Sequence, residues 1–119
     1  MTRSYRNNNP GNIIFGPFAR KYEGQMEKCE NARFAVFPTA AKGVHALVAL
    51  LSGISYKDLN IKEAIYRYAP ASENATESYI NFVCTYANLQ PDMVIANLDA
   101  FQFIELVKAI TKREGYSRD

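Results

Sequence analysis

The stretch DAFQFIELVKAITKREG, residues 99–115, carries the clearest structural signal in the chain. Asp99 stands where a helix needs a capping side chain, and Gln102 follows at the third helical position. Gly115 supplies the left-handed conformation that commonly ends a helix. Between them, the apolar residues recur at helical spacing and form one stripe: Phe103, Leu106, Val107 and Ile110. The pattern therefore predicts a helix that begins after Asp99 and ends at Glu114.

Two further helices are predicted between Pro38 and Pro70. Thr39 is expected to cap the first one. The second should begin near Asp58 or Asn60, and it must end before Pro70 because proline disfavours helix in the residue that precedes it. The apolar stripe of the first helix is expected to be Val44, Leu47, Val48, Leu51 and Ile54, and that of the second Ile61, Ile65 and Tyr68.

The segment after Pro70 predicts a third helix and a short helical turn. Asn74 and Glu77, three residues apart, resemble a capping box. The helix that they open should run through Tyr86 and end before the breaking sequence at residues 90–92. An apolar segment, residues 93–98, is expected to add a turn of helix.

The N-terminal third predicts a small hairpin. Residues 6–12, RNNNPGN, are turn formers whose side chains bond to their own backbone or tolerate unusual dihedral angles. Short strands are expected at residues 13–15 and 33–37, and they would pair across a long loop, residues 16–32. The predicted fold is a single α+β domain over residues 1–119, mostly helical, with an N-terminal β-hairpin and four to five helices.

Composition and charge argue against several classes of function. The chain has 119 residues, a net charge of +2 and one histidine, His45. This charge is far from that of a dedicated nucleic-acid domain, and the cysteines Cys29 and Cys84 have no zinc-site spacing. No apolar run is long enough for a membrane span, and no secretory signal follows Met1. We therefore expect no metal, no cofactor and no nucleic-acid partner, and synthesis in the cytoplasm.

Glu114 is the first candidate for a catalytic carboxyl group. The partial negative charge of a helix C-terminus disfavours an ionised carboxylate, and a partly apolar setting acts in the same direction. A carboxyl group that keeps its proton near neutral pH can act as a general acid in glycosidic cleavage. Glu23 and Glu73, both in predicted loops, are weaker candidates, and a solvated surface role is open for each of the three. His45 and the cysteines have no local feature of a nucleophilic site.

Four segments together resemble a known family. Residues 6–13, RNNNPGNI, closely resemble the opening of small phage and prophage lysozyme-like lytic proteins. The likeness continues in residues 34–37, FAVF, followed by Gly43. It returns in residues 68–79, where Tyr68 replaces the family's tryptophan, and in Ala109-Ile110 with Glu114-Gly115. The chain departs from the family pattern after Glu114, where Gly115-Tyr116 replaces an asparagine.

The resemblance implies a peptidoglycan-cleaving enzyme with a lysozyme-like domain. In such enzymes the catalytic glutamate commonly ends a helix and precedes an Asn-rich hairpin. Here the order is reversed, as a circular permutation would produce, so the Asn-rich turn and Glu114 would meet in space. Glu114 would then be the general acid, and Glu73 or Glu23 a second carboxylate. The implied substrate-binding residues are Asn8, Asn9, Asn12, Glu23, Tyr68, Asn74 and Tyr79.

The resemblance also implies the partners and the place of action. The substrate would be the glycan strands of peptidoglycan, cleaved by a lytic transglycosylase or a muramidase at the bacterial cell wall, with phage virion or lysis proteins as further partners. Three alternatives stay open: a non-catalytic virion or wall-binding protein, a peptidoglycan endopeptidase, and nucleic-acid binding through Arg3 and Arg6.

Overall fold

The protein is described by a computed structural model for residues 1–14, 29–30, 34–70 and 75–116. Contacts within the chain divide it into two compact units. Unit 1 contains Met1–Leu50 and Glu114–Asp119, and unit 2 contains Leu51–Arg113. The first and last parts of the chain thus belong to the same unit. The expectation of one domain over residues 1–119 stays a prediction.

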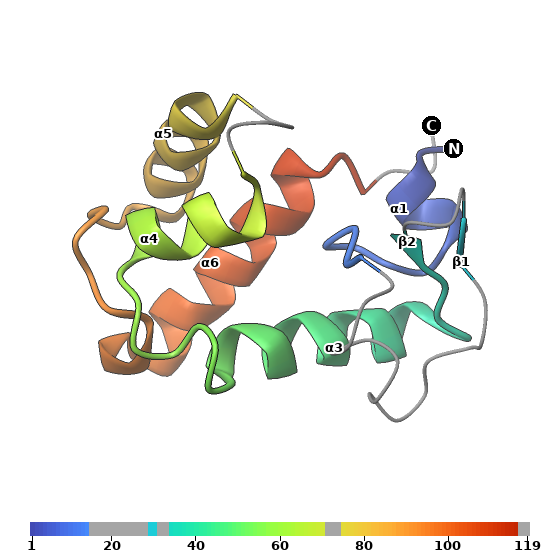
Figure 1. Ribbon diagram of the computed structural model, residues 1–119, viewed down its shortest axis with the longest axis horizontal. Coiled ribbons are helices and arrows are strands. Elements are labelled where there is room, and N and C mark those ends of the chain that lie inside the picture. Colours follow the sequence, from blue (N-terminus) through green and yellow to red (C-terminus); the bar gives the residue numbers. More distant parts are fainter. Residues whose placement is uncertain (15–28, 31–33, 71–74, 117–119) are drawn as a thin grey trace. The chain divides into compact units, whose positions relative to one another are not determined.

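Unit 1 contains a short helix, a small sheet and most of a longer helix (Figure 1). Helix α1 spans Arg3–Arg6, and helix α3 begins in this unit and spans Ala40–Ser52. Strands β1, Cys29–Glu30, and β2, Phe34–Ala35, pair antiparallel, with Cys29 opposite Ala35. These two strands form the small β element of an otherwise helical chain.

The expected pairing of residues 13–15 with residues 33–37 is found only in part. Ile14 forms an isolated antiparallel bridge with Phe34, and the Ala35 N–H donates to the Ile13 carbonyl at 2.9 Å. The strand partner of β2, however, is β1, which the sequence analysis placed in a loop. The residue pair Cys29–Glu30 has no alternating, β-branched pattern, so the usual strand signal is missing there.

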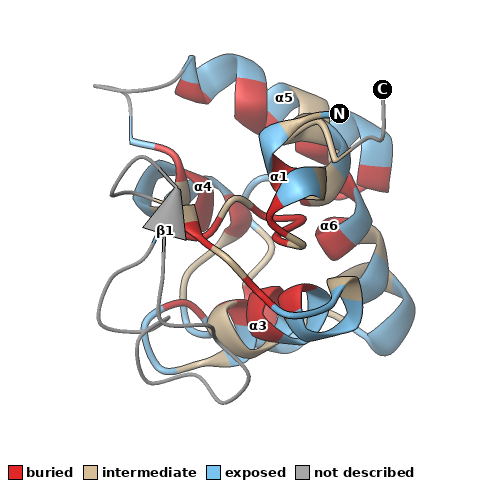
Figure 2. Ribbon diagram, turned by 90° about the vertical axis from the view of Figure 1, so that its right-hand side faces the viewer, coloured by how far each residue is buried: buried red, intermediate tan, exposed pale blue. Residues whose placement is uncertain are grey.

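Helix α3 begins where the sequence predicts but buries a different stripe. Thr39 Oγ1 accepts from the Lys42 N–H at 3.2 Å, which confirms the cap. Val44 and Val48 are each 36% exposed, and Ile54 lies beyond the helix end and is 89% exposed. The expectation that these three residues are buried was therefore wrong. The buried positions of the helix are Gly43, Ala46, Leu47 and Leu51, and Figure 2 shows buried and exposed positions along the same helix.

In unit 2, helix α4 spans Ile61–Tyr68 and has a complete capping box. Asn60 Oδ1 accepts from the Glu63 N–H at 2.8 Å, and Glu63 Oε1 accepts from the Asn60 N–H at 3.0 Å. The helix ends at Tyr68, and its C-cap residue, Ala69, directly precedes Pro70. These bounds confirm the predicted second helix, because both of its ends are set by local hydrogen bonding and proline geometry.

Helix α5 spans Thr76–Ala87, and its predicted capping box was wrong. The N-cap position is Ala75, which has no capping side chain. Thr76 Oγ1 instead donates to the Ala69 carbonyl at 2.7 Å, and the Glu77 carboxylate accepts from the Tyr66 hydroxyl. Of the two residues that the pattern assigned to the capping box, Glu77 is thus used in a contact with the preceding helix, and Asn74 lies outside the described residues.

The 3₁₀ turn η1, Ile95–Asn97, and helix α6, Ala100–Arg113, complete unit 2. The α6 capping box is confirmed, since Asp99 Oδ1 accepts from the Gln102 N–H at 2.8 Å and Gln102 Oε1 accepts from the Asp99 N–H at 2.9 Å. Helix α5 packs against both α4 and α6. The core that they share is Ile61, Ile65, Tyr79, Ile80, Val83, Leu106 and Ile110. The mostly helical α+β class is confirmed.

Candidate active site

The Asn-rich turn is held by hydrogen bonds from Asn9. This side chain is completely buried, with 0% exposure. Its Nδ2 donates to the carbonyls of Ile13 at 3.0 Å and Ala35 at 2.9 Å, and its Oδ1 accepts from the Ile13 N–H at 2.9 Å. Asn9 therefore ties the turn to β2 and uses its whole amide to do so. This is a structural role, and we do not assign Asn9 to substrate binding.

Asn8 joins the same turn to the segment that leads into α3. Its backbone is left-handed, with φ at 52°, and its Nδ2 donates to the Phe37 carbonyl at 3.0 Å. The Phe37 N–H in turn donates to the Asn7 carbonyl at 2.9 Å. A Cβ on Gly43 would stand 1.9 Å from the Asn8 carbonyl oxygen. Two of the four segments that carry the family resemblance, residues 6–13 and residues 34–37 with Gly43, are thus packed together.

Glu114 meets the last residue of this turn. Asn12 Nδ2 donates to Glu114 Oε1 at 3.0 Å and to the Glu114 backbone carbonyl at 3.4 Å, across 102 residues of sequence. Both residues are partly exposed, and their contact is partly buried. Helix α6 ends at Arg113, and Gly115 has φ at 72°, so Glu114 lies in the turn directly after the helix. The expected meeting of the Asn-rich turn with Glu114 is therefore present in unit 1.

A pair of tyrosines packs beside this contact. The ring centroids of Tyr5, in α1, and Tyr116 are 5.3 Å apart, and Figure 1 shows α1 and the segment after α6 side by side. Burial raises the pKa of Tyr116 above 10.0, and neighbouring Tyr5 raises it further. The sequence analysis missed this pair. Two tyrosines at opposite ends of a chain give no local signal that they will touch.

The described part of unit 1 is poor in carboxylates. It contains no aspartate, and Glu30 in β1 is its only glutamate besides Glu114. Arg3, Arg6 and Lys42 provide positive charge in the same unit. Arg113, which precedes Glu114 in sequence, places its guanidinium 5.0 Å from the ring centroid of Tyr79.

The other predicted site residues lie either outside the described residues or in unit 2. Glu23, Glu73 and Asn74 lie outside the described residues. Tyr79 belongs to the core of unit 2 and is 1% exposed, so its ring has no surface for a sugar and we do not assign it to substrate binding. Tyr68 is partly exposed and packs edge-on to Tyr56, with ring centroids 6.4 Å apart. Tyr68 and Tyr79 are in unit 2, whereas the Asn12–Glu114 contact is in unit 1.

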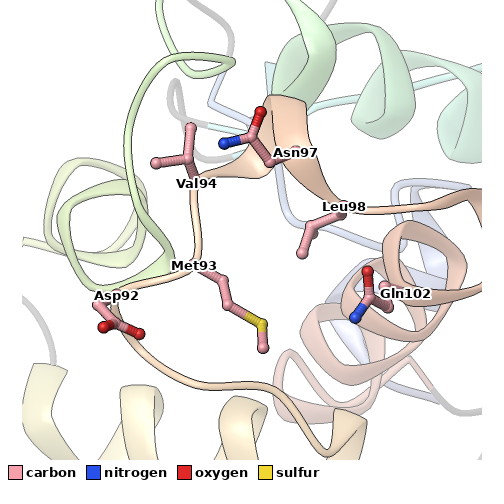
Figure 3. Close-up of a pocket in the computed structure, with 6 residues that line it drawn as sticks. All are labelled: Asp92, Met93, Val94, Asn97, Leu98 and Gln102. Carbon is pink, nitrogen blue, oxygen red and sulfur yellow. The ribbon is translucent and has the colours of Figure 1, made fainter.

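Unit 2 also has a shallow pocket of about 330 Å³, shown in Figure 3. The residues that line it come from the loop before α6 and from its first turn: Asp92, Met93, Val94, Asn97, Leu98 and Gln102. Gln102 Oε1 already accepts from the Asp99 N–H, and Met93 Sδ accepts from the Gln90 N–H at 3.5 Å. Two of its polar groups are therefore engaged in local structure, and we do not identify this pocket as an active site.

Within the described residues, no three His, Cys, Asp or Glu side chains gather as metal ligands would. None of the helices in the described residues has the length and the apolar character that a membrane-spanning segment needs.

Comparison with known proteins finds similarity to a bacteriophage protein. No family model matches the chain. Protein P5 of Pseudoalteromonas phage PM2 is 39% identical over 84 residues, which cover 68% of this chain and 52% of that protein. The chain thus spans about half the length of this curated relative. This similarity connects the chain with a bacteriophage protein, but the name of that protein states no activity.

Proposed function

We propose that this protein cleaves the glycan strands of peptidoglycan, with Glu114 as the general acid. The observation that carries the proposal is the hydrogen bond between Asn12 Nδ2 and Glu114 Oε1 at 3.0 Å. It joins a carboxyl group at the end of a helix to an Asn-rich turn, which is the combination that the resemblance to lysozyme-like proteins requires. A circularly permuted lysozyme-like fold is part of the same proposal.

In the proposed reaction Glu114 gives its proton to the glycosidic oxygen. The bond between this oxygen and the anomeric carbon breaks, and its electron pair stays with the leaving sugar. The ionised Glu114 then takes a proton from the attacking hydroxyl. In a lytic transglycosylase that hydroxyl belongs to the substrate itself and closes a 1,6-anhydro ring, whereas in a muramidase it belongs to water.

The single-acid route is favoured because the sequence pairs no second carboxylate firmly with Glu114. A retaining glycosidase needs a second carboxylate at about 5 Å, and an inverting one at roughly 6.5–9.5 Å. We favour a lytic transglycosylase on this ground, and we keep Glu23 and Glu73, which lie outside the described residues, as the candidates for a second carboxylate in a muramidase.

The proposal also includes where the protein is made and where it acts. The phage relative supports a phage origin. Synthesis in the host cytoplasm and action at the cell wall, either during lysis or from a virion, belong to the same proposal. Partners would then include other virion or lysis proteins. Contact of the partly exposed Tyr68 with the saccharide stays a prediction.

The decisive experiment compares purified wild-type protein with Glu114→Gln on isolated Gram-negative sacculi. Loss of a general acid slows such reactions by about 10²- to 10⁴-fold, so release of soluble muropeptides should fall by that factor. Glu105→Gln is the matched control, because Glu105 lies on α6 and is also partly exposed. It should retain full activity, and circular dichroism should show both variants folded.

Mass spectra of the released products separate the alternatives. Anhydro-muropeptides indicate a transglycosylase and reducing ends a muramidase. Intact glycan strands with cut crosslinks would indicate an endopeptidase and overturn the proposal. Equal release by wild type and Glu114→Gln would exclude Glu114 as the acid. Binding to sacculi without any release would instead identify a wall-binding protein.

A further inference from the structure

We propose that Asn12 is a positioning residue for Glu114, an inference that rests on the proposed function. Its side-chain amide would hold Oε1 as a hydrogen-bond acceptor and so leave the transferable proton on Oε2. Asn12 would then act through Glu114 and not by holding the sugar, which is the role that the sequence alone suggested for it.

The direction of the hydrogen bond follows from the chemistry of its acceptors. The same end of the Asn12 amide lies 3.0 Å from Glu114 Oε1 and 3.4 Å from the Glu114 backbone carbonyl oxygen. A backbone carbonyl only accepts hydrogen bonds, so the end that faces both atoms is the NH₂ group. In a neutral carboxyl group, the oxygen that accepts this bond is the carbonyl oxygen, and the proton belongs to the other one.

The opposite end of the Asn12 amide differs from that of Asn9. Asn12 Oδ1 is buried and has no hydrogen-bond partner within the described structure. Burying an unpartnered acceptor destabilises a protein. Asn9, three residues earlier, uses both ends of its amide in backbone hydrogen bonds. The two asparagines therefore differ: Asn9 completes the turn, and Asn12 directs its donor end to Glu114.

The backbone holds Asn12 in place for this contact. Its φ of 50° is left-handed, and its N–H donates to the Asn9 carbonyl at 2.9 Å. The amide is thus anchored on the turn before any substrate arrives. When Glu114 has given up its proton, the bond to Oε1 becomes charge-assisted and stronger. An interaction that strengthens as the reaction proceeds raises kcat more than it changes KM.

The test uses two variants that keep the left-handed backbone. Asn12→Gly removes the amide without backbone strain, and Asn12→Asp keeps the shape but has no donor when ionised. On soluble, uncrosslinked glycan strands, each should lower kcat by about 10- to 100-fold, the effect of losing a hydrogen bond to a charged group, with KM unchanged. Asn88→Gly is the control, because Asn88 has φ at 57° and is exposed. It should behave as wild type.

Two kinetic results would overturn the inference. A raised KM with normal kcat in Asn12→Gly would make Asn12 a substrate-binding residue, and full activity of Asn12→Asp would show that the donor is not needed. If Glu114→Gln is inactive while Asn12→Gly is normal, this inference fails and the proposed function stands. If Glu114→Gln is fully active, both fail.

A further measurement keeps Asn12 in place and so does not depend on folding of the Asn12 variants. In NMR spectra, the side-chain NH₂ resonances of Asn12 should move in Glu114→Gln, because the acceptor changes from a carboxyl to an amide group. They should stay in place in Glu105→Gln. No movement in Glu114→Gln would contradict the contact on which the inference depends.

Discussion

A Cβ atom on Gly43 would stand 1.9 Å from the backbone carbonyl oxygen of Asn8, so α3 and the Asn-rich turn are in contact at a position that only glycine allows. Pro10 Cδ would lie only 2.8 Å from the same Cβ. Neither neighbour is the end of a flexible side chain, since one is backbone and the other a ring atom. The first residues of α3 therefore support the turn that meets Glu114.

The Gly43→Ala variant should consequently lose stability, although alanine is the better helix former. Relief of the overlap requires α3 or the turn to shift, and such overpacking typically costs about 1–3 kcal/mol. Urea denaturation of the two proteins measures the difference. Lys42→Ala, at the exposed neighbouring position, is the control and should change little. A stable Gly43→Ala would mean that α3 does not approach the turn so closely.

Asn9→Ala should destabilise unit 1 more than any other change in the turn. It leaves the Ile13 N–H and the Ala35 carbonyl without the side chain that satisfies them, and it removes one of the two donors to the Ile13 carbonyl, which keeps the Ala35 N–H. Each buried group left unsatisfied costs about 1–3 kcal/mol, so we expect a loss of roughly 2–4 kcal/mol after partial relaxation.

The midpoint of thermal unfolding measures this loss. Asn97→Ala removes an amide from an exposed position and should leave the midpoint near that of wild type. Equal midpoints for Asn9→Ala and Asn97→Ala would contradict the structural role of Asn9.

Stability should fall at alkaline pH, in part through Tyr56. Burial raises the pKa of Tyr56 above 10.0, partly offset by the guanidinium of Arg67, which lies 5.9 Å from the ring centroid. A raised pKa means that the unfolded chain loses this proton first. The contribution is therefore fully present below pH 10 and is lost as the pH rises through the folded-state pKa.

Urea unfolding at about pH 8 and about pH 10.5 tests this expectation. Tyr56→Phe removes the ionisable group and should reduce the loss of stability between the two values. Tyr86→Phe, at a site that is 45% exposed, should leave the loss unchanged. The same loss in Tyr56→Phe as in wild type would show that Tyr56 does not contribute.

The predicted capping of helices was correct where the cap is local and wrong where a tertiary contact competes for the side chain. Asp99 and Gln102 form the expected box because both of its bonds join residues three apart. Glu77 matched the same pattern, but its carboxylate accepts from Tyr66 on α4. Sequence spacing cannot show that a neighbouring helix will present a better partner.

The predictions for the site residues show the same difference between local features and tertiary contacts. The choice of Glu114 followed from its place at a helix end and from the resemblance, and its contact with Asn12 agrees with that choice. Tyr79 shares a helix face with other apolar residues, and such a face can either line a groove or pack into a core. Its 1% exposure identifies it as core. Periodicity indicates which residues share a face but not what covers that face.

The sequence alone was sufficient for the helical class, the ends of α4 and α6, and the turn at residues 6–12, because caps, prolines and asparagine turns act over three or four residues. Only the tertiary structure decided that Asn12 reaches Glu114, that Tyr5 meets Tyr116 and that α3 is rotated to bury Gly43. These contacts join distant parts of the chain, and their formation depends on the packing of whole elements, which no short stretch of sequence encodes.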